Sequence, residues 1–190
     1  MKIETIKKLP NILSMARILS VPVVIALLML AKGPVGMWTA VILFVVSAAT
    51  DSLDGYIARK YNAITTFGKF IDPVADKLLA VSVLIWAAYN SGLAWVTVVA
   101  ILTTAREFII SAFRLVAVSA EGKVIAAGWL GKVKTITQYI ALTAYMLRYS
   151  VIGALANWVF VIFLVISAIM TVWSCVDYIW KNRAVLMGEM

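Results

Sequence analysis

The sequence has no histidine and a single cysteine, Cys175. Without histidine there can be no histidine general base, no Ser-His-Asp or Cys-His catalytic group and no histidine-ligated zinc. One cysteine can form neither an intramolecular disulfide nor a cysteine-rich metal site. Any chemistry must therefore depend on carboxylates, lysine, arginine, hydroxyl groups and, if a metal takes part, a hard metal ion.

Charged residues are also scarce, at 14% of the 190 residues, whereas apolar residues make up 64%. An ordinary soluble domain has roughly 45–50% apolar and about 25% charged residues, and a water-soluble fold of this size could not bury so much apolar surface. A membrane-spanning helix needs about 20 apolar residues, so six such helices would use roughly 120 residues. That leaves no room for a large soluble domain.

The apolar runs predict an all-α, polytopic membrane protein with six transmembrane helices, which form a single integral-membrane domain over residues 1–190. Three lysines precede the first run, as in a signal peptide, but Arg17 interrupts that run and no small-x-small cleavage site follows. We therefore expect the first span to be retained. The predicted spans are roughly 11–31, 35–58, 74–90, 93–117, 134–150 and 154–180.

Basic residues at the ends of these runs predict the topology. One side of the membrane would carry nine of them and the other only Lys32 and Arg148, so both termini should be cytoplasmic. The net charge of +8 is then explained without nucleic-acid binding. The basic residues meet anionic lipid head groups, and no soluble basic face is available to bind nucleic acid. The nine residues are Lys2, Lys7, Lys8, Lys60, Lys69, Lys123, Lys132, Lys181 and Arg183.

Four of the five aspartates lie within residues 51–76. Asp51 and Asp54 are three residues apart and Asp72 and Asp76 are four apart, and each spacing places both carboxylates on one face of a helix. Four carboxylates that converge would repel one another unless cations neutralise them. Oxygen ligands suit Mg²⁺ or Mn²⁺, and several bridging carboxylates suit a site for two metal ions.

The connection predicted at 59–71 is short enough to bring these two helix ends together, with Gly68 allowing a tight turn. Gly55 and Ala58 are small and would let a ligand approach the backbone closely, and Arg59 offers a planar fork for phosphate. Two metal ions and an arginine indicate a site for a diphosphate rather than an ion-conduction path.

Residues 51–76 read Asp-x2-Asp-Gly-x2-Ala-Arg-x8-Gly-x3-Asp-x3-Asp, which resembles the signature of the CDP-alcohol phosphotransferases. The resemblance implies that the four aspartates hold two divalent cations and that Asp76 is also the general base. It implies that Gly55, Arg59 and Thr65, beside Ala58 and Gly68, bind the CDP-lipid. It also implies a homodimer.

The alcohol acceptor must be inferred from outside this motif. Arg106 and Arg114 are eight residues apart on the fourth span, about 80° around the helix, so both could face one pocket. Lys132 and Lys134 lie at the start of the fifth span. We expect the four cations to form a basic pocket next to the metal site, which suits the phosphate of a phosphorylated acceptor. The alternative for the arginines is an ion pair with Glu107 or contact with lipid phosphate.

Three segments, 9–17, 62–79 and 106–111, resemble the bacterial branch of the family whose acceptor is glycerol 3-phosphate, although Ser14 replaces an expected threonine. The resulting hypothesis is two-metal, in-line transfer of a phosphatidyl group from CDP-diacylglycerol to the 1-hydroxyl of glycerol 3-phosphate, with release of CMP. This step of phospholipid biosynthesis would occur at the cytoplasmic face of the inner membrane.

Two alternatives stay open. One is a sibling enzyme that uses inositol phosphate, serine or phosphatidylglycerol as acceptor. The other is an ion-coupled transporter, which is disfavoured because the acids lie near one predicted edge of the membrane and no inverted repeat is visible.

Overall fold

The computed structural model describes the backbone of residues 3–30, 33–60, 66–121, 128–148, 150 and 152–183. Within these ranges, side chains are described except in segments 3–10, 51–59, 66–70 and 115–121 and at positions 34, 72, 73 and 76.

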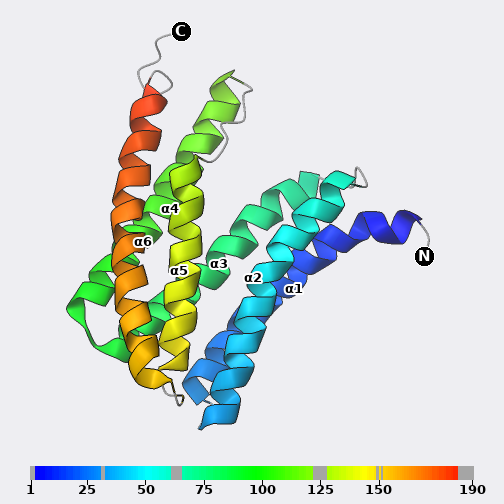
Figure 1. Cartoon of the computed structure of the whole chain (residues 1–190). Helices are drawn as coiled ribbons and strands as arrows, with labels where there is room; N and C mark the ends of the chain where they lie inside the picture. The colour runs from blue at the N-terminus through cyan, green and yellow to red at the C-terminus, as the bar shows by residue number, and fades with distance from the viewer. Residues whose placement is uncertain are drawn as a thin grey trace. The chain divides into compact units, whose positions relative to one another are not determined.

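The described chain is entirely helical, which confirms the all-α prediction (Figure 1). Its helices are α1 (Ile3–Leu30), α2 (Pro34–Lys60), α3 (Thr66–Ser91), α4 (Ala94–Glu121), α5 (Trp129–Leu147) and α6 (Gly153–Lys181).

Two of the predicted helix connections carry a glycine in the left-handed region. Gly33 has φ 96° and is followed by Pro34, the first residue of α2, where the missing amide hydrogen and fixed φ of proline are tolerated. Gly92 has φ 65° and follows Ser91, the last residue of α3. The first lies between the predicted spans 11–31 and 35–58 and the second between 74–90 and 93–117, so both connections are confirmed.

The predictions for two other connections were wrong, because both were too long. α2 continues to Lys60 and α3 already begins at Thr66, so Gly68 lies in the first turn of α3 and does not form a tight turn in a loop. Similarly, α4 ends at Glu121 and α5 begins at Trp129, five residues before the predicted start. Hydropathy detects only the apolar part of a helix, whereas backbone hydrogen bonding continues into its polar ends.

The chain divides into two compact units. The first comprises Met1–Trp86 with Met146–Ala154, and the second comprises Ala87–Tyr145 with Leu155–Met190. In the first unit α1 and α2 lie side by side (Figure 1). Apart from the adjacent pair Ala40 and Val41, their buried residues recur every three, four or seven positions, as expected for two facing helix surfaces. These residues are Ser14, Arg17, Val24 and Leu28 on α1 and Ala40, Val41, Phe44 and Ser47 on α2.

In the second unit, the buried face of α6 changes character along the helix. Its first half buries Ala156, Phe160 and Leu164, and the ring of Phe160 packs 4.6 Å from that of Tyr145 and 6.1 Å from that of Trp95, measured between centroids. Its second half buries hydroxyl residues at the same helical spacing. These are Ser167, Thr171, Ser174 and Tyr178.

The outer surface of α6 is apolar, with Leu155, Ile162 and Val176 each more than half exposed. A helix that buries hydroxyl groups and exposes large apolar side chains suits a lipid environment. Three described segments are long and apolar enough to cross a membrane: Asn11–Leu30, Ala94–Arg114 and Gly153–Lys181. Two shorter apolar stretches lie at Val35–Thr50 and Lys77–Ser91. The protein is therefore a helical membrane protein, and the count of six spans stays a prediction.

Candidate active site

The four aspartates of the motif lie on two consecutive helices of the first unit. Asp51 and Asp54 belong to the last part of α2, and Asp72 and Asp76 belong to the first part of α3. Each pair therefore has the helical backbone that its spacing required. The four carboxylates themselves lie outside the described side chains, so their convergence stays a prediction.

The residues predicted to bind the CDP-lipid lie in the same part of the chain. Gly55, Ala58 and Arg59 are in the last turns of α2, and Gly68 is in the first turn of α3. Their surroundings and the whole of Thr65 lie outside the described residues. Among the side chains that are described, no three histidine, cysteine, aspartate or glutamate residues form a group that could hold a metal ion.

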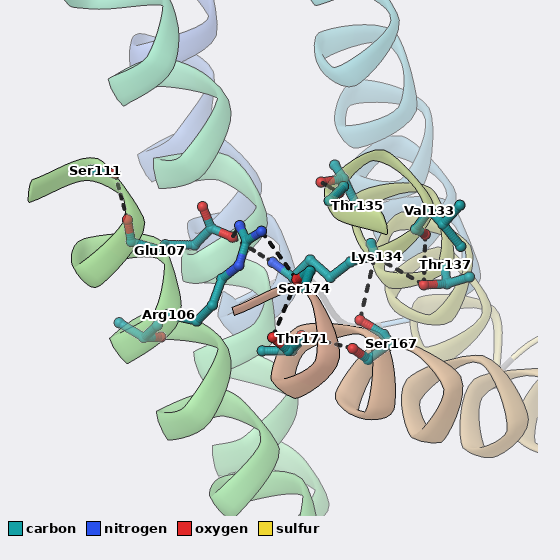
Figure 2. A network of polar contacts seen from close by, with 12 residues as sticks. Arg106, Glu107, Ser111, Val133, Lys134, Thr135, Thr137, Ser167, Thr171 and Ser174 are labelled. Atoms are coloured by element: carbon teal, nitrogen blue, oxygen red, sulfur yellow. Dashed lines mark hydrogen bonds and ion pairs between the residues drawn. The ribbon is translucent and has the colours of Figure 1, made fainter. Parts of the chain in front are cut away.

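A second polar cluster, in the second unit, lies among the described side chains. Oε1 of Glu107 on α4 accepts a hydrogen bond from Nη1 of Arg106 at 3.0 Å and another from Nζ of Lys134 on α5 at 2.7 Å. The three side chains are 13%, 12% and 3% exposed, respectively. Figure 2 shows them meeting beside Ser174 of α6. We call Arg106, Glu107 and Lys134 the charged cluster.

The second half of α6, which buries hydroxyl residues, packs against one side of this cluster. Nη2 of Arg106 donates to Oγ of Ser174 at 3.2 Å, and Oγ of Ser167 donates to the carbonyl oxygen of Lys134 at 3.4 Å (Figure 2). Thr171 donates to the carbonyl of Ser167 within α6. The polar stripe of α6 is therefore the third wall of the charged cluster, which explains why it is buried in an apolar helix.

The other two predicted acceptor-binding residues are placed differently. Arg114 lies against α6, with its guanidinium carbon 5.7 Å from the ring centroid of Tyr178, in cation–π range. Lys132 is exposed. The structure thus brings Arg106 and Lys134 together through Glu107 and directs Arg106 and Arg114 to the same helix.

Several buried donors on α4 and α5 have no hydrogen-bond partner among the described residues. They are Nε of Arg106, Nε of Arg114 and Nε2 of Gln138, which lies one turn after Lys134 on α5. Buried donors are nearly always satisfied, so the unpaired ones on these two helices are candidates to bind an anion. Close approach is also built in at Gly131, where a β-carbon would lie 3.2 Å from Nη2 of Arg106.

Comparison with known proteins identifies the family. Residues 7–173 match the family model described as CDP-alcohol phosphatidyltransferase. The chain belongs to this family. The match includes the aspartate motif and the charged cluster, and it confirms the family predicted from residues 51–76.

Curated relatives cover nearly the whole chain. A protein of Haemophilus influenzae is 37% identical over 185 residues, which are 96% of this chain and 97% of that protein. One from Bacillus subtilis is 38% identical over 178 residues, covering 84% and 90%. One from Escherichia coli K12 is 36% identical over 186 residues, covering 95% and 98%. All three are named CDP-diacylglycerol–glycerol-3-phosphate 3-phosphatidyltransferase.

Sequence analysis of this phosphatidyltransferase missed the central position of Glu107, which it considered only as a partner that would remove Arg106 from function. It also missed Ser174. A signal was present, because Ser167, Thr171 and Ser174 recur at helical spacing in an otherwise apolar run. No comparable signal pairs Glu107 with Lys134, which is 27 positions away.

Proposed function

We propose that the protein transfers the phosphatidyl group of CDP-diacylglycerol to the 1-hydroxyl of sn-glycerol 3-phosphate, giving phosphatidylglycerophosphate and CMP. The names of the relatives suggest both substrates. The observation that supports a phosphorylated acceptor is the charged cluster with its unpaired donors. In this cluster two cations from two membrane helices are buried around one carboxylate. A neutral amino alcohol or a zwitterion such as serine would need fewer cations.

We assign the acceptor phosphate to Arg106, Arg114, Lys132 and Lys134. Arg106 and Arg114 offer planar donors, which suit phosphate oxygens. Among the unpaired buried nitrogens, two belong to these arginines and another to Gln138. A bound phosphate would accept from donors that the described chain leaves free, and Lys132 would supply charge from its exposed position.

The aspartate motif is proposed to bind the diphosphate of the lipid donor. Asp51, Asp54, Asp72 and Asp76 form an oxygen-only donor set on two helices, which fits Mg²⁺ or Mn²⁺ and would hold two such ions. When bound, the cations would supply neutralisation of the diphosphate and of the charge that develops on the attacking and leaving oxygens.

The chain's own residues then carry out the proton transfer. Asp76 accepts the proton of the 1-hydroxyl while that oxygen bonds to the β-phosphorus. The bond from this phosphorus to the bridging oxygen breaks, and CMP leaves with the electron pair. Gly55, Ala58 and Gly68 allow close approach of the CDP-lipid, and Arg59 and Thr65 bind it.

The proposal places the enzyme in the bacterial inner membrane as a single domain of six spans, with both termini and the active site on the cytoplasmic side. The basic residues at the span ends support this orientation. We also propose a homodimer, as the family resemblance implies.

The decisive experiment offers the purified protein CDP-diacylglycerol, Mg²⁺ or Mn²⁺, and a panel of acceptors, and measures CMP release. We expect glycerol 3-phosphate to give the highest kcat/KM among glycerol 3-phosphate, inositol phosphate, serine and phosphatidylglycerol. Faster release with another member of the panel would refute glycerol 3-phosphate as the acceptor. Absence of metal-dependent CMP release with every acceptor would refute the proposed transferase activity.

A matched pair of variants tests the acceptor site. Lys134→Gln removes a cation of the charged cluster, and Lys181→Gln removes one from an exposed pair with Asp177. We expect the first to raise the KM for glycerol 3-phosphate at least tenfold, since a hydrogen bond to a charged group contributes about 1.5–3 kcal/mol. The second should leave that KM unchanged. Equal KM values in both variants would remove Lys134 from the acceptor site.

A further inference from the structure

A buried arginine joins α1 to α2 in the first unit. Arg17 is 2% exposed although it lies within the apolar segment Asn11–Leu30. Its Nε donates to the carbonyl oxygen of Ser47 at 3.0 Å, and its Nη2 donates to Oγ1 of Thr50 at 3.3 Å. One planar side chain from α1 therefore binds two positions of α2 that lie about one helical turn apart.

The hydrogen bonds around Arg17 form a closed circuit. Thr50 donates to the carbonyl of Ser47 at 2.7 Å, and Oγ of Ser47 donates to Oγ of Ser20 at 3.0 Å. Ser20 in turn donates to the carbonyl of Arg17 at 2.7 Å. Because each member bonds the next, sliding α1 along α2 by one residue would break several polar contacts that are buried or partly buried. The circuit therefore sets the register between the two helices.

This register reaches the aspartate motif through the backbone of α2. Thr50 is followed directly by Asp51, and α2 continues as a helix to Lys60. A helix rises about 1.5 Å per residue, so a one-residue slip would move Asp51 along its axis by about that distance. Divalent ions such as Mg²⁺ demand near-ideal ligand geometry, and misplacement of about 1 Å can cost two orders of magnitude in rate.

We propose that Arg17 is a positioning residue. Through Thr50 and Ser47 it fixes the position of α2 along α1, and with it the positions of Asp51 and Asp54. It thereby tunes the affinity for divalent cations. This inference rests on the proposed function, because it takes the two aspartates as metal ligands. In this role Arg17 acts through α2 and has no contact with substrate. Its hydrogen-bonding partners, and not its charge alone, carry the effect.

The test compares variants of the circuit by Mn²⁺ binding, measured from the free-Mn²⁺ signal in electron paramagnetic resonance without turnover. Removal of groups that orient metal ligands typically weakens affinity about 10–100-fold. We expect Arg17→Gln to raise the Kd for Mn²⁺ within that range and Thr50→Val to raise it about tenfold. Thr50→Ser keeps the hydroxyl and should restore the wild-type Kd.

The matched control is Thr39→Val. Thr39 also lies on α2, but it is exposed and its hydroxyl donates only within its own helix, to the carbonyl of Val35 at 2.9 Å. This variant should bind Mn²⁺ as the wild type does. If Arg17→Gln fails to fold, the contrast between Thr50→Val and Thr50→Ser decides alone.

A purely structural role gives a different result. In that case the variants would unfold at lower temperature while their folded fraction kept the wild-type Kd for Mn²⁺, and the proposal would be overturned. Failure of the proposed function would give a separate result. Wild-type protein that binds Mn²⁺ but releases no CMP from CDP-diacylglycerol would refute the proposed reaction. The Mn²⁺ titrations would still decide the role of Arg17.

Discussion

Replacing Glu107 with glutamine should make the protein less stable yet increase its affinity for the acceptor phosphate. The carboxylate accepts two hydrogen bonds, from Arg106 at 3.0 Å and from Lys134 at 2.7 Å, and all three side chains are largely buried. Glutamine has nearly the same size and keeps one acceptor oxygen, but it removes the only negative charge in the charged cluster. Two buried cations would then lack a counter-ion in the cluster.

The magnitude follows from the lost counter-charge. Both donors stay ionised and can still donate to the glutamine oxygen. Breaking a buried ion pair by removing one partner costs about 3–5 kcal/mol, so we expect glutamine, which keeps an acceptor oxygen, to cost somewhat less, about 2–3 kcal/mol. A protein of this length would then unfold at a temperature lower by about 4–12 °C. Phosphate that binds the two cations in place of the lost carboxylate regains part of this energy. Since about 1.4 kcal/mol corresponds to a tenfold change, we expect the Kd for phosphate to fall about tenfold.

The assay is thermal unfolding of the purified protein over a range of inorganic phosphate or glycerol 3-phosphate concentrations. The control is Asp177→Asn, which breaks the pair with Lys181, whose side chain is 68% exposed. Exposed pairs contribute about 0–1 kcal/mol, so this variant should match the wild type at every phosphate concentration. The reasoning is refuted if Glu107→Gln is as stable as the wild type without phosphate, or if phosphate stabilises both proteins equally.

Three further substitutions test the remaining assignments. Asp76→Asn should abolish CMP release while CDP-diacylglycerol binding stays measurable, and substantial turnover would exclude Asp76 as the base. Arg114→Gln should raise the KM for glycerol 3-phosphate more than that for the lipid, and an unchanged KM would give Arg114 a structural role. Gly131→Ala places a methyl group 3.2 Å from Nη2 of Arg106 and should raise the acceptor KM several-fold. Gly128→Ala meets nothing within 4 Å and is its control, so an equal effect in both would contradict the steric argument.

The helical fold and the family could be predicted because their signals are local. Apolar runs of helical length predict the helices, and the motif at 51–76 fixes its residues by spacing within one short segment. Helix ends were less predictable. Thr66 to Ile71 contains Gly68 and Lys69 and was predicted as part of a connection, yet it is the start of α3, because backbone hydrogen bonds and not hydropathy define where a helix ends.

The candidate acceptor site was predicted in part for a similar reason. The positive charges of Arg106 and Lys134 are visible in the sequence, and a phosphorylated acceptor was inferred from them. Both cations bind Glu107 only because α4 packs against α5. This packing brings Glu107 and Lys134, which are 27 residues apart, into contact. A single sequence contains no periodic signal for such a pair, so the carboxylate was considered only as a competitor for the arginine.

The two described polar networks solve the same physical problem. In a membrane protein a buried cation cannot be solvated by lipid, so the helices around it must supply its partners. Arg17 receives them from hydroxyl and carbonyl groups of α2, whereas Arg106 receives them from Glu107 and from the hydroxyl stripe of α6. The first network is a closed circuit, which suits a group that holds a helix in register. The second retains an unpaired donor on Arg106, and Arg114 and Gln138 on the same two helices, α4 and α5, each have another, which suits a site that must still bind an anion.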